Sequence, residues 1–181
     1  MRVITGTARG RKLVSPVGYD VRPTSDMAKE SVFSILNFDI EGKVFLDLFA
    51  GSGQMGIEAL SRGAEKAIFI DNSRDAQKVI AQNIKITGFE SKSRLDYKDY
   101  KSFLTTNTET IDIAFLDPPY NKKMIDEALP LLSDSMSENG IIVCESDKKE
   151  ELPEQAGDFK VHKVYQYGRV KITVYRRNEG K

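Results

Sequence analysis

The stretch V-F-L-D-L-F-A-G-S-G-Q-M-G at residues 44–56 decides the fold. Its first half is an apolar run that predicts a buried strand, and its glycines predict a tight loop that leads into a helix over residues 55–62. Gly63 then supplies the residue with which helices commonly end. A strand, a glycine loop and a helix in this order open a doubly wound α/β sheet, where ligands bind at the carboxyl ends of the strands.

The rest of the chain alternates in the same way. Strands are expected at residues 67–71, 94–97, 111–116 and 141–145. Helices are expected from a cap at Thr24 or Ser25 to residue 37, from a cap at Ser73 to residue 87, and from residue 122, where Pro130 should kink or divide the helix. Residues 160–177 read as an antiparallel hairpin around Gly168. We therefore predict a Rossmann-like, mostly parallel sheet with helices on both faces and a C-terminal hairpin.

Composition limits the functional classes. A chain of 181 residues forms one domain with a full core, and no apolar run approaches the length of a membrane span. Because the N-terminus lacks the layout of a signal peptide, we expect a cytoplasmic protein, and nothing demands more than a monomer. A single Cys144 and a single His162 leave little material for a metal centre or for Ser/His catalysis, so we expect no metal.

Charge is divided unevenly although the net charge is zero. Residues 1–25 hold five Lys and Arg against one acidic residue, and residues 160–181 hold seven against one, so the middle of the chain is acidic. Basic ends suit a phosphate backbone, although charged termini also serve solubility alone. We expect residues 1–22 to form a basic extension and residues 23–181 to form the main domain.

The glycine loop fits two kinds of cofactor. Asp71, about 20 residues after Gly51, suits a ribose hydroxyl in a dinucleotide or in S-adenosylmethionine. Asp47 at the mouth of the loop should repel a pyrophosphate, because like charges a few Å apart cost on the order of a few kcal/mol near a surface. S-adenosylmethionine is a net cation, and Asp99 and Asp117 also fall at or near expected strand ends. The acidic edge therefore favours S-adenosylmethionine.

The tetrapeptide Asp117-Pro118-Pro119-Tyr120 directly follows the expected strand at residues 111–116. The prolines stiffen the turn and cannot continue a sheet. Asp117 and the Pro118 carbonyl can accept the two protons of an exocyclic amine, and Tyr120 can stack on the base that carries it. Alone, the pattern is also compatible with an ordinary proline turn.

Taken together, these motifs follow the plan of class I methyltransferases that act on exocyclic amines, and the chain resembles one such family along nearly its whole length. The family is that of the RsmD-type bacterial 16S ribosomal RNA guanine-N2 methyltransferases. The segments that carry the resemblance are R-V-I-T-G at 2–6, R-G-R-K-L at 9–13, R-P-T at 22–24, L-D-L-F-A-G-S-G at 46–53, E-A-L-S-R-G-A at 58–64 and D-P-P-Y at 117–120. The chain departs from the family pattern at Met27, where an Arg is usual, and at Gln54 after the glycines.

The resemblance implies S-adenosylmethionine as cofactor and 16S ribosomal RNA within the small ribosomal subunit as partner. The residues expected at the cofactor are Asp47, Phe49, Ala50, Gly51, Ser52, Gly53, Asp71, Asn72, Asp99 and Asp117. The residues expected in catalysis are Asp117, Pro118, Pro119 and Tyr120. The residues expected at the RNA are Arg9, Arg11, Lys12, Arg22 and Thr24.

Three alternatives remain open at this point. The D-P-P-Y motif fits methylation of adenine N6 in DNA or RNA equally well. A nicotinamide-dependent oxidoreductase shares the glycine pattern but is disfavoured by Asp47 and by the lack of a substrate domain. A non-catalytic RNA-binding relative is disfavoured by the intact glycine loop and Asp117.

Overall fold

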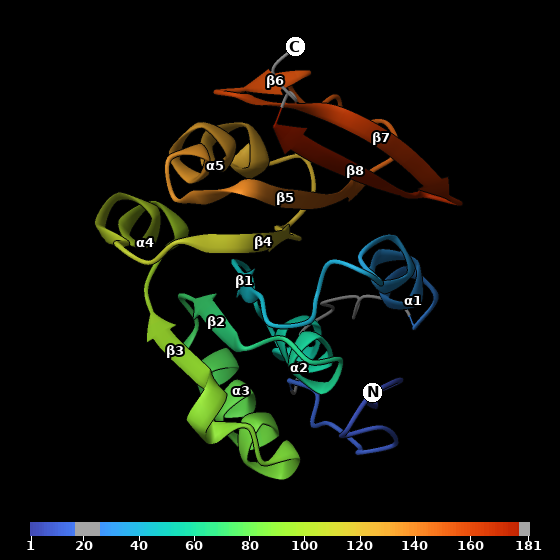
Figure 1. Ribbon diagram of the computed structural model, residues 1–181, viewed down its shortest axis with the longest axis vertical. Helices are drawn as coiled ribbons and strands as arrows, with labels where there is room; N and C mark the ends of the chain where they lie inside the picture. Colours follow the sequence, from blue (N-terminus) through green and yellow to red (C-terminus); the bar gives the residue numbers. More distant parts are fainter. Residues whose placement is uncertain (17–25, 178–181) are drawn as a thin grey trace.

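The computed structural model describes residues 1–16 and 26–177, and it is built around one sheet of eight strands (Figure 1). The strands lie in the order β3-β2-β1-β4-β5-β8-β7-β6. Their bounds are β1 Val44–Asp47, β2 Lys66–Asp71, β3 Ser93–Tyr97, β4 Ile111–Leu116, β5 Met136–Asp147, β6 Gln155–Ala156, β7 Phe159–Tyr167 and β8 Val170–Arg177. Strands β1 to β5 pair in parallel, whereas β5 and β8, β7 and β8, and β6 and β7 pair in antiparallel. The predicted fold class is confirmed.

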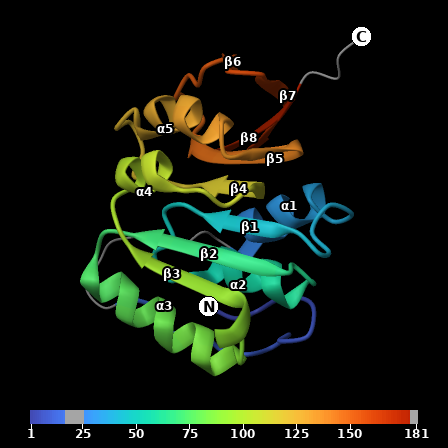
Figure 2. The same cartoon turned by 60° about the vertical axis from the view of Figure 1, so that its left-hand side comes forward.

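Helices cover both faces of the sheet (Figure 2). Their bounds are α1 Asp26–Ile35, α2 Gln54–Ser61, α3 Arg74–Thr87, α4 Tyr100–Thr106 and α5 Met124–Ser133, with a short 3-10 turn at Glu90–Lys92 before β3. Because neighbouring side chains of a strand point to opposite faces, Phe45 packs with α1, α2 and α3, and Leu46 packs with α4 and α5. The alternation thus divides the core into two hydrophobic clusters. None of the helices in the described part of the chain has the length and apolar character to cross a membrane.

Local signals predicted some elements better than others. The hydroxyl of Ser73 caps α3 by accepting from the N–H of Ala76 at 3.3 Å, and Gly88 ends the helix with a φ of 75°. The expected caps at Thr24 and Ser25 lie outside the described residues. Helix α4 was not predicted, and α5 runs from Met124 to Ser133 without division at Pro130.

The N-terminal segment packs on the face that carries α1, α2 and α3. Arg2 and Lys12 form an antiparallel bridge, and Val3, Ala8 and Leu13 are buried in the cluster beneath those helices. The expected boundary near Arg22, together with Thr24, lies outside the described residues.

The order of strands reverses at β1, which lies between β2 and β4. The helices that follow β1 and β4 therefore go to opposite faces, and in open α/β sheets ligands bind at the carboxyl ends of strands at such a switch point. Asp47 ends β1 and Asp117 directly follows β4, so the two carboxylates expected from the sequence flank this switch point.

Candidate active site

The glycine loop at residues 48–53 is hydrogen-bonded to the ends of the two strands that flank β1. The N–H of Leu48 donates to the Phe115 carbonyl of β4 at 3.1 Å, and the N–H of Ala50 donates to the Ile70 carbonyl of β2 at 3.0 Å. Gly51 and Gly53 have φ values of 58° and 76°, which favour glycine. A Cβ at Gly51 would meet no atom within 4 Å, so the loop is open to a ligand at this position.

Asp71 fixes the shape of that loop from the end of β2. Its Oδ2 accepts from the N–H of Gly51 at 2.9 Å, and its Oδ1 accepts from the N–H of Ser73 at 2.8 Å. The carboxylate, half-buried, therefore joins the glycine loop to the N-terminus of α3. Asn72, the next residue, is exposed beside it.

Asp47 lies beneath the loop, which differs from the expectation that it faces the mouth. It is 1% exposed, and its Oδ2 accepts from the N–H of Gly56 in α2 at 3.1 Å. Burial raises the pKa of Asp47 to about 8, with a smaller upward contribution from the nearby Asp71 and an opposing one from the Gly56 hydrogen bond. The carboxyl is largely protonated at neutral pH, so its charge cannot be what excludes a pyrophosphate.

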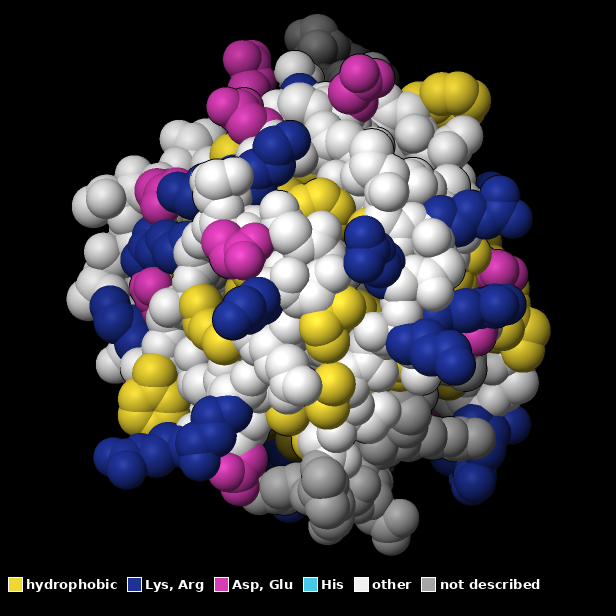
Figure 3. Space-filling model, turned by 90° about the horizontal axis from the view of Figure 1, so that it is seen from below, with side chains coloured by type: hydrophobic (Ala, Val, Ile, Leu, Met, Phe, Trp, Pro, Cys, Tyr) yellow, Lys and Arg dark blue, Asp and Glu magenta, His cyan; other side chains and the backbone are white. Residues whose placement is uncertain are grey.

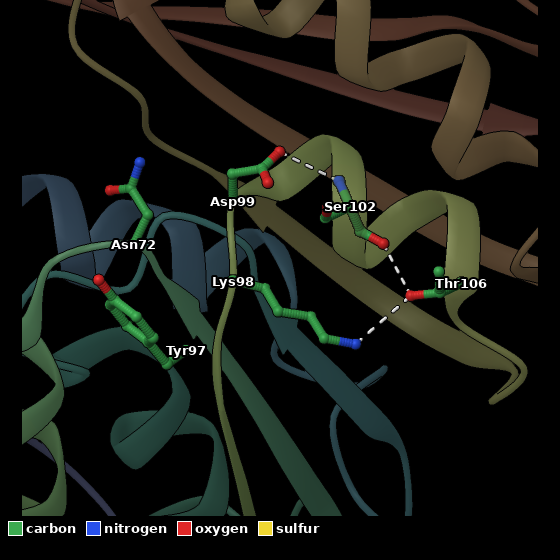
Figure 4. A pocket seen from close by; sticks show the side chains of 6 residues that line it. All are labelled: Asn72, Tyr97, Lys98, Asp99, Ser102 and Thr106. Atoms are coloured by element: carbon green, nitrogen blue, oxygen red, sulfur yellow. Dashed lines mark hydrogen bonds between the residues drawn. The ribbon is translucent and has the colours of Figure 1, made fainter.

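A pocket of about 410 Å³ lies at the carboxyl ends of β2 and β3. It is lined by Asn72, Tyr97, Lys98, Asp99, Ser102 and Thr106 (Figure 4). Asp99 caps α4 by accepting from the N–H of Ser102 at 3.1 Å, and this hydrogen bond holds the pKa of Asp99 below its usual value. Of these residues the sequence singled out Asn72 and Asp99. Tyr97, 56% exposed at a strand end, was missed although an exposed aromatic there signals a flat ligand.

The Asp117–Tyr120 turn lies beside the end of β5. Asp117 is half-buried, Pro118 is buried and Pro119 is exposed. The Tyr120 hydroxyl donates to Oε1 of Glu145 at 3.1 Å, which anchors the half-buried ring.

Phe49 extends this edge of the site toward α4. Its ring lies 5.2 Å from the ring of Tyr100, centroid to centroid. Apolar and aromatic surface therefore continues from the glycine loop to the first residue of α4. Ser52 and Ala50, also expected at the cofactor, are buried within the loop.

Arg9, Arg11 and Lys12 are exposed, but the first two lie away from the glycine loop. The N–H of Thr7 donates to the Ser61 carbonyl at the last residue of α2, whereas the loop precedes the first residue of that helix. Eight helical residues span about 12 Å, so an RNA held by both regions must extend along α2.

Figure 3 shows the end of the molecule at which the N-terminal segment and α3 lie. Lys and Arg side chains are spread over this surface, with fewer Asp and Glu among them.

Within residues 1–16 and 26–177, no three His, Cys, Asp or Glu side chains come together in a way that would hold a metal ion. Cys144 is buried in β5 and burial raises the pKa of its thiol. Arg22 and Thr24, also expected at the RNA, lie outside the described residues.

Comparison with known proteins agrees with the geometry. The family model described as "Conserved hypothetical protein 95" matches residues 1–176. The chain is 37% identical to YlbH of Bacillus subtilis, whose name proposes an rRNA methyltransferase, over 98% of this chain and 99% of that protein. It is 33% identical to ribosomal RNA small subunit methyltransferase D of Escherichia coli over 98% of this chain and 90% of that protein.

Solved structures agree as well. The E. coli protein yhhF, titled as a methyltransferase, superimposes with a TM-score of 0.85 at 33% identity, over 98% of this chain and 97% of that chain. Sequence and fold therefore match from the N-terminal segment to the C-terminal hairpin. The chain belongs to the RsmD family of S-adenosylmethionine-dependent RNA methyltransferases.

Proposed function

We propose that this protein transfers a methyl group from S-adenosylmethionine to the exocyclic N2 amine of one guanine in 16S ribosomal RNA of the small subunit. The observation that carries the proposal is the position of Asp117 and Pro118 at the end of β4, beside the open glycine loop at the switch point. The name of the E. coli relative, a small-subunit methyltransferase, supports the choice of RNA.

The residues present fit S-adenosylmethionine. Open space at Gly51 admits a ligand against the loop, and the edge carries the carboxylates of Asp71 and Asp99, which suit a net cation. Gly51, Ser52 and Gly53 would face the methionine part, Asp71 and Asn72 the ribose, and Asp99 the adenine amine, with Phe49 and Ala50 completing the loop wall. Asp47 would act from below by holding the loop against α2.

S-adenosylmethionine supplies a methyl group on a positively charged sulfur, which is an excellent leaving group. The amine of guanine is a poor nucleophile, because its lone pair is delocalised into the ring. Asp117 and the Pro118 carbonyl would accept hydrogen bonds from its two N–H groups and so orient the amine for methyl transfer. Orientation of this kind supplies a large part of the rate acceleration. After transfer, the extra proton goes to Asp117 or to water.

The target base must leave its stack to reach this turn. Tyr120, whose ring is anchored through Glu145, stacks on the extruded base and replaces part of the lost stacking. Pro119, exposed at the turn, has a fixed φ and keeps the turn rigid while the base enters. The turn would accept adenine N6 as well, and the choice of guanine rests on the resemblance carried mainly by the N-terminal segment.

Arg9, Arg11 and Lys12 hold RNA phosphates in this proposal, and Arg22 and Thr24 border the base pocket. The salt dependence of RNA binding should be steep, because each phosphate contact releases counterions.

Asp117→Ala tests the catalytic assignment. The variant should bind S-adenosylmethionine as tightly as the wild type in calorimetry and should lose at least about 100-fold in kcat for methyl transfer to small subunits. Asp158→Ala, at an exposed residue between β6 and β7, is the control and should behave as the wild type. Unchanged turnover of Asp117→Ala would remove Asp117 from the mechanism, and tight binding of NADH in place of S-adenosylmethionine would contradict the cofactor.

A further inference from the structure

A buried carboxylate fastens the basic N-terminal segment, residues 2–12, to helix α2. Glu58 is 0% exposed, and its two oxygens accept from the backbone N–H groups of Ile4 and Thr5, each at 2.9 Å. These partners are more than 50 positions apart in the chain. Hydrogen bonds to an ionised oxygen are stronger than neutral ones, so Glu58 holds the backbone of the segment firmly.

Two cations complete this buried cluster. The Arg62 Nε lies 3.0 Å from Oε1 of Glu58, and the Lys29 Nζ of α1 lies 4.0 Å from Oε2. Lys29, which is 0% exposed, also donates to the Arg2 carbonyl at 2.8 Å and to Oε1 of Gln54 at 3.2 Å. The unusual Gln54 thus has a structural reason, since it gives a buried ammonium a polar partner. The cluster therefore holds the segment through two backbone N–H groups, those of Ile4 and Thr5, and through the carbonyl of Arg2.

Ser61 provides a second point of attachment, at the end of α2. Its hydroxyl donates to the Thr5 carbonyl at 2.6 Å and accepts from the N–H of Ala8 at 2.9 Å. Between these two residues Gly6 has a φ of 89°, and a Cβ there would lie 1.7 Å from the Ser61 carbonyl oxygen. The segment therefore touches α2 so closely that only glycine fits at this position.

The backbone of the segment is held inside while its charges face outward. The exposed cations of the segment are Arg2, Arg9, Arg11 and Lys12. Because the backbone is already ordered, binding a phosphate to these side chains does not have to order the segment first. A segment that is already ordered should therefore bind RNA phosphates more tightly than a free tail of the same composition.

We propose that Glu58, Ser61 and Lys29 are positioning residues for the RNA substrate, which hold residues 2–12 as a preformed phosphate-binding surface. The proposal rests on the proposed function, since it takes RNA as the substrate. These residues touch neither the RNA nor the reacting atoms. Their loss should raise KM for RNA and leave kcat unchanged, because a saturating substrate orders the segment by its own binding.

Gly6→Ala, with Gly88→Ala at the end of α3 as its control, tests this arrangement from the side of the segment. Both glycines have positive φ, 89° and 75°, so both substitutions carry similar backbone strain, but a Cβ at Gly88 meets nothing within 4 Å. We expect Gly6→Ala to raise KM for small subunits about tenfold or more with unchanged kcat and unchanged affinity for S-adenosylmethionine. Gly88→Ala should keep KM within about twofold of the wild type.

The salt dependence of RNA binding gives a readout that a loss of stability alone would not move. If all four cations lose their phosphates, the slope of log affinity against log salt should become shallower by up to about 3. Hydrogen exchange of the amides at residues 4–8 should accelerate in Gly6→Ala and not in Gly88→Ala. Ser61→Ala, which removes two hydrogen bonds without leaving a buried charge, should show the same changes in smaller measure.

The outcomes separate this proposal from the function it rests on. If the wild type methylates no ribosomal RNA, the proposed function fails, and the exchange rates still report whether the attachment exists. If Gly6→Ala loses protection at residues 4–8 but keeps the KM and the salt slope of the wild type, the positioning role is overturned. A fall of kcat equal to the fall of kcat/KM would also overturn it, since the defect would then lie in the chemistry.

Discussion

Asp47 should lower the free energy of unfolding of the wild type as the pH rises toward neutrality. The substitution Asp47→Asn should remove this pH-dependent decrease. In the folded protein the carboxyl is buried beneath the glycine loop and its pKa is about 8, against an ordinary value of 3.8. Between these two pH values the Asp47 carboxyl holds a proton in the folded protein, whereas the same carboxyl in the unfolded chain has already released it. Linkage requires that the contribution of Asp47 to stability is greatest below pH 4 and is lost as the pH rises to about 8.

The magnitude follows from the width of that interval. Between pH 5 and pH 7 the unfolded chain is ionised at Asp47 and the folded protein is not, so stability falls by about 1.4 kcal/mol per pH unit, or about 3 kcal/mol over the window. An asparagine does not titrate, and any constant cost of its amide group cancels in the comparison. The difference in free energy of unfolding should thus shift by about 3 kcal/mol in favour of Asp47→Asn between the two pH values.

Urea denaturation followed by far-UV circular dichroism measures this difference, since the chain has no Trp for a fluorescence assay. Asp75→Asn, at an exposed residue in the first turn of α3, controls for the removal of one negative charge. Parallel pH profiles for the wild type and Asp47→Asn would refute the reasoning. They would mean that Asp47 is ionised in the fold, as a side chain at the mouth of the loop would be.

Substitutions at three further positions probe the packing and the site. Gly56→Ala should lower the free energy of unfolding by about 1–3 kcal/mol in urea denaturation, because its Cβ would lie 2.3 Å from the Phe69 ring; unchanged stability would show that α2 can move away from β2 at no cost. Asp71→Ala, which leaves the N–H of Gly51 without its acceptor, should weaken S-adenosylmethionine binding about tenfold or more in calorimetry, and unaltered affinity would speak against a role for Asp71. Tyr120→Leu should raise KM for RNA about tenfold while Tyr120→Phe, which keeps the ring, should not; equal values for the two would deny the ring a stacking role.

Elements with local signals could be predicted closely. The ends of α3 follow from a serine that caps and a glycine that stops the helix, both encoded within one turn of the boundary. The parallel strands β1 and β4 follow from short apolar runs that are buried on both faces. Such features need no knowledge of distant residues.

Features that depend on distant partners could not be predicted. Strand β5 begins at Met136, before the apolar run at residues 141–145, because polar residues there continue the sheet across a shift of register against β4. Helix α4 has only Phe103 and Leu104 as buried apolar residues, too few for a helical period, although the cap at Asp99 was a usable signal. Tertiary contacts supply what the local pattern lacks.

The direction of a side chain at the end of a strand is another such feature. Asp47 and Asp71 occupy equivalent places after apolar runs, yet the first is buried and the second is half-buried over the loop. Asp47 accepts from the N–H of Gly56 inside the fold, whereas Asp71 accepts from the N–H groups of Gly51 and Ser73. The attachment of the N-terminal segment to Glu58 was likewise not predictable, since the backbone N–H groups of Ile4 and Thr5 lie more than 50 positions away from it in the chain.

The most direct test of the proposed activity is transfer of a labelled methyl group from S-adenosylmethionine to small ribosomal subunits and to naked 16S RNA, followed by nucleoside analysis. We expect label in N2-methylguanosine, at one site, in at least one of the two substrates. Label on adenosine, or no transfer to either substrate by protein that binds the cofactor, would contradict it.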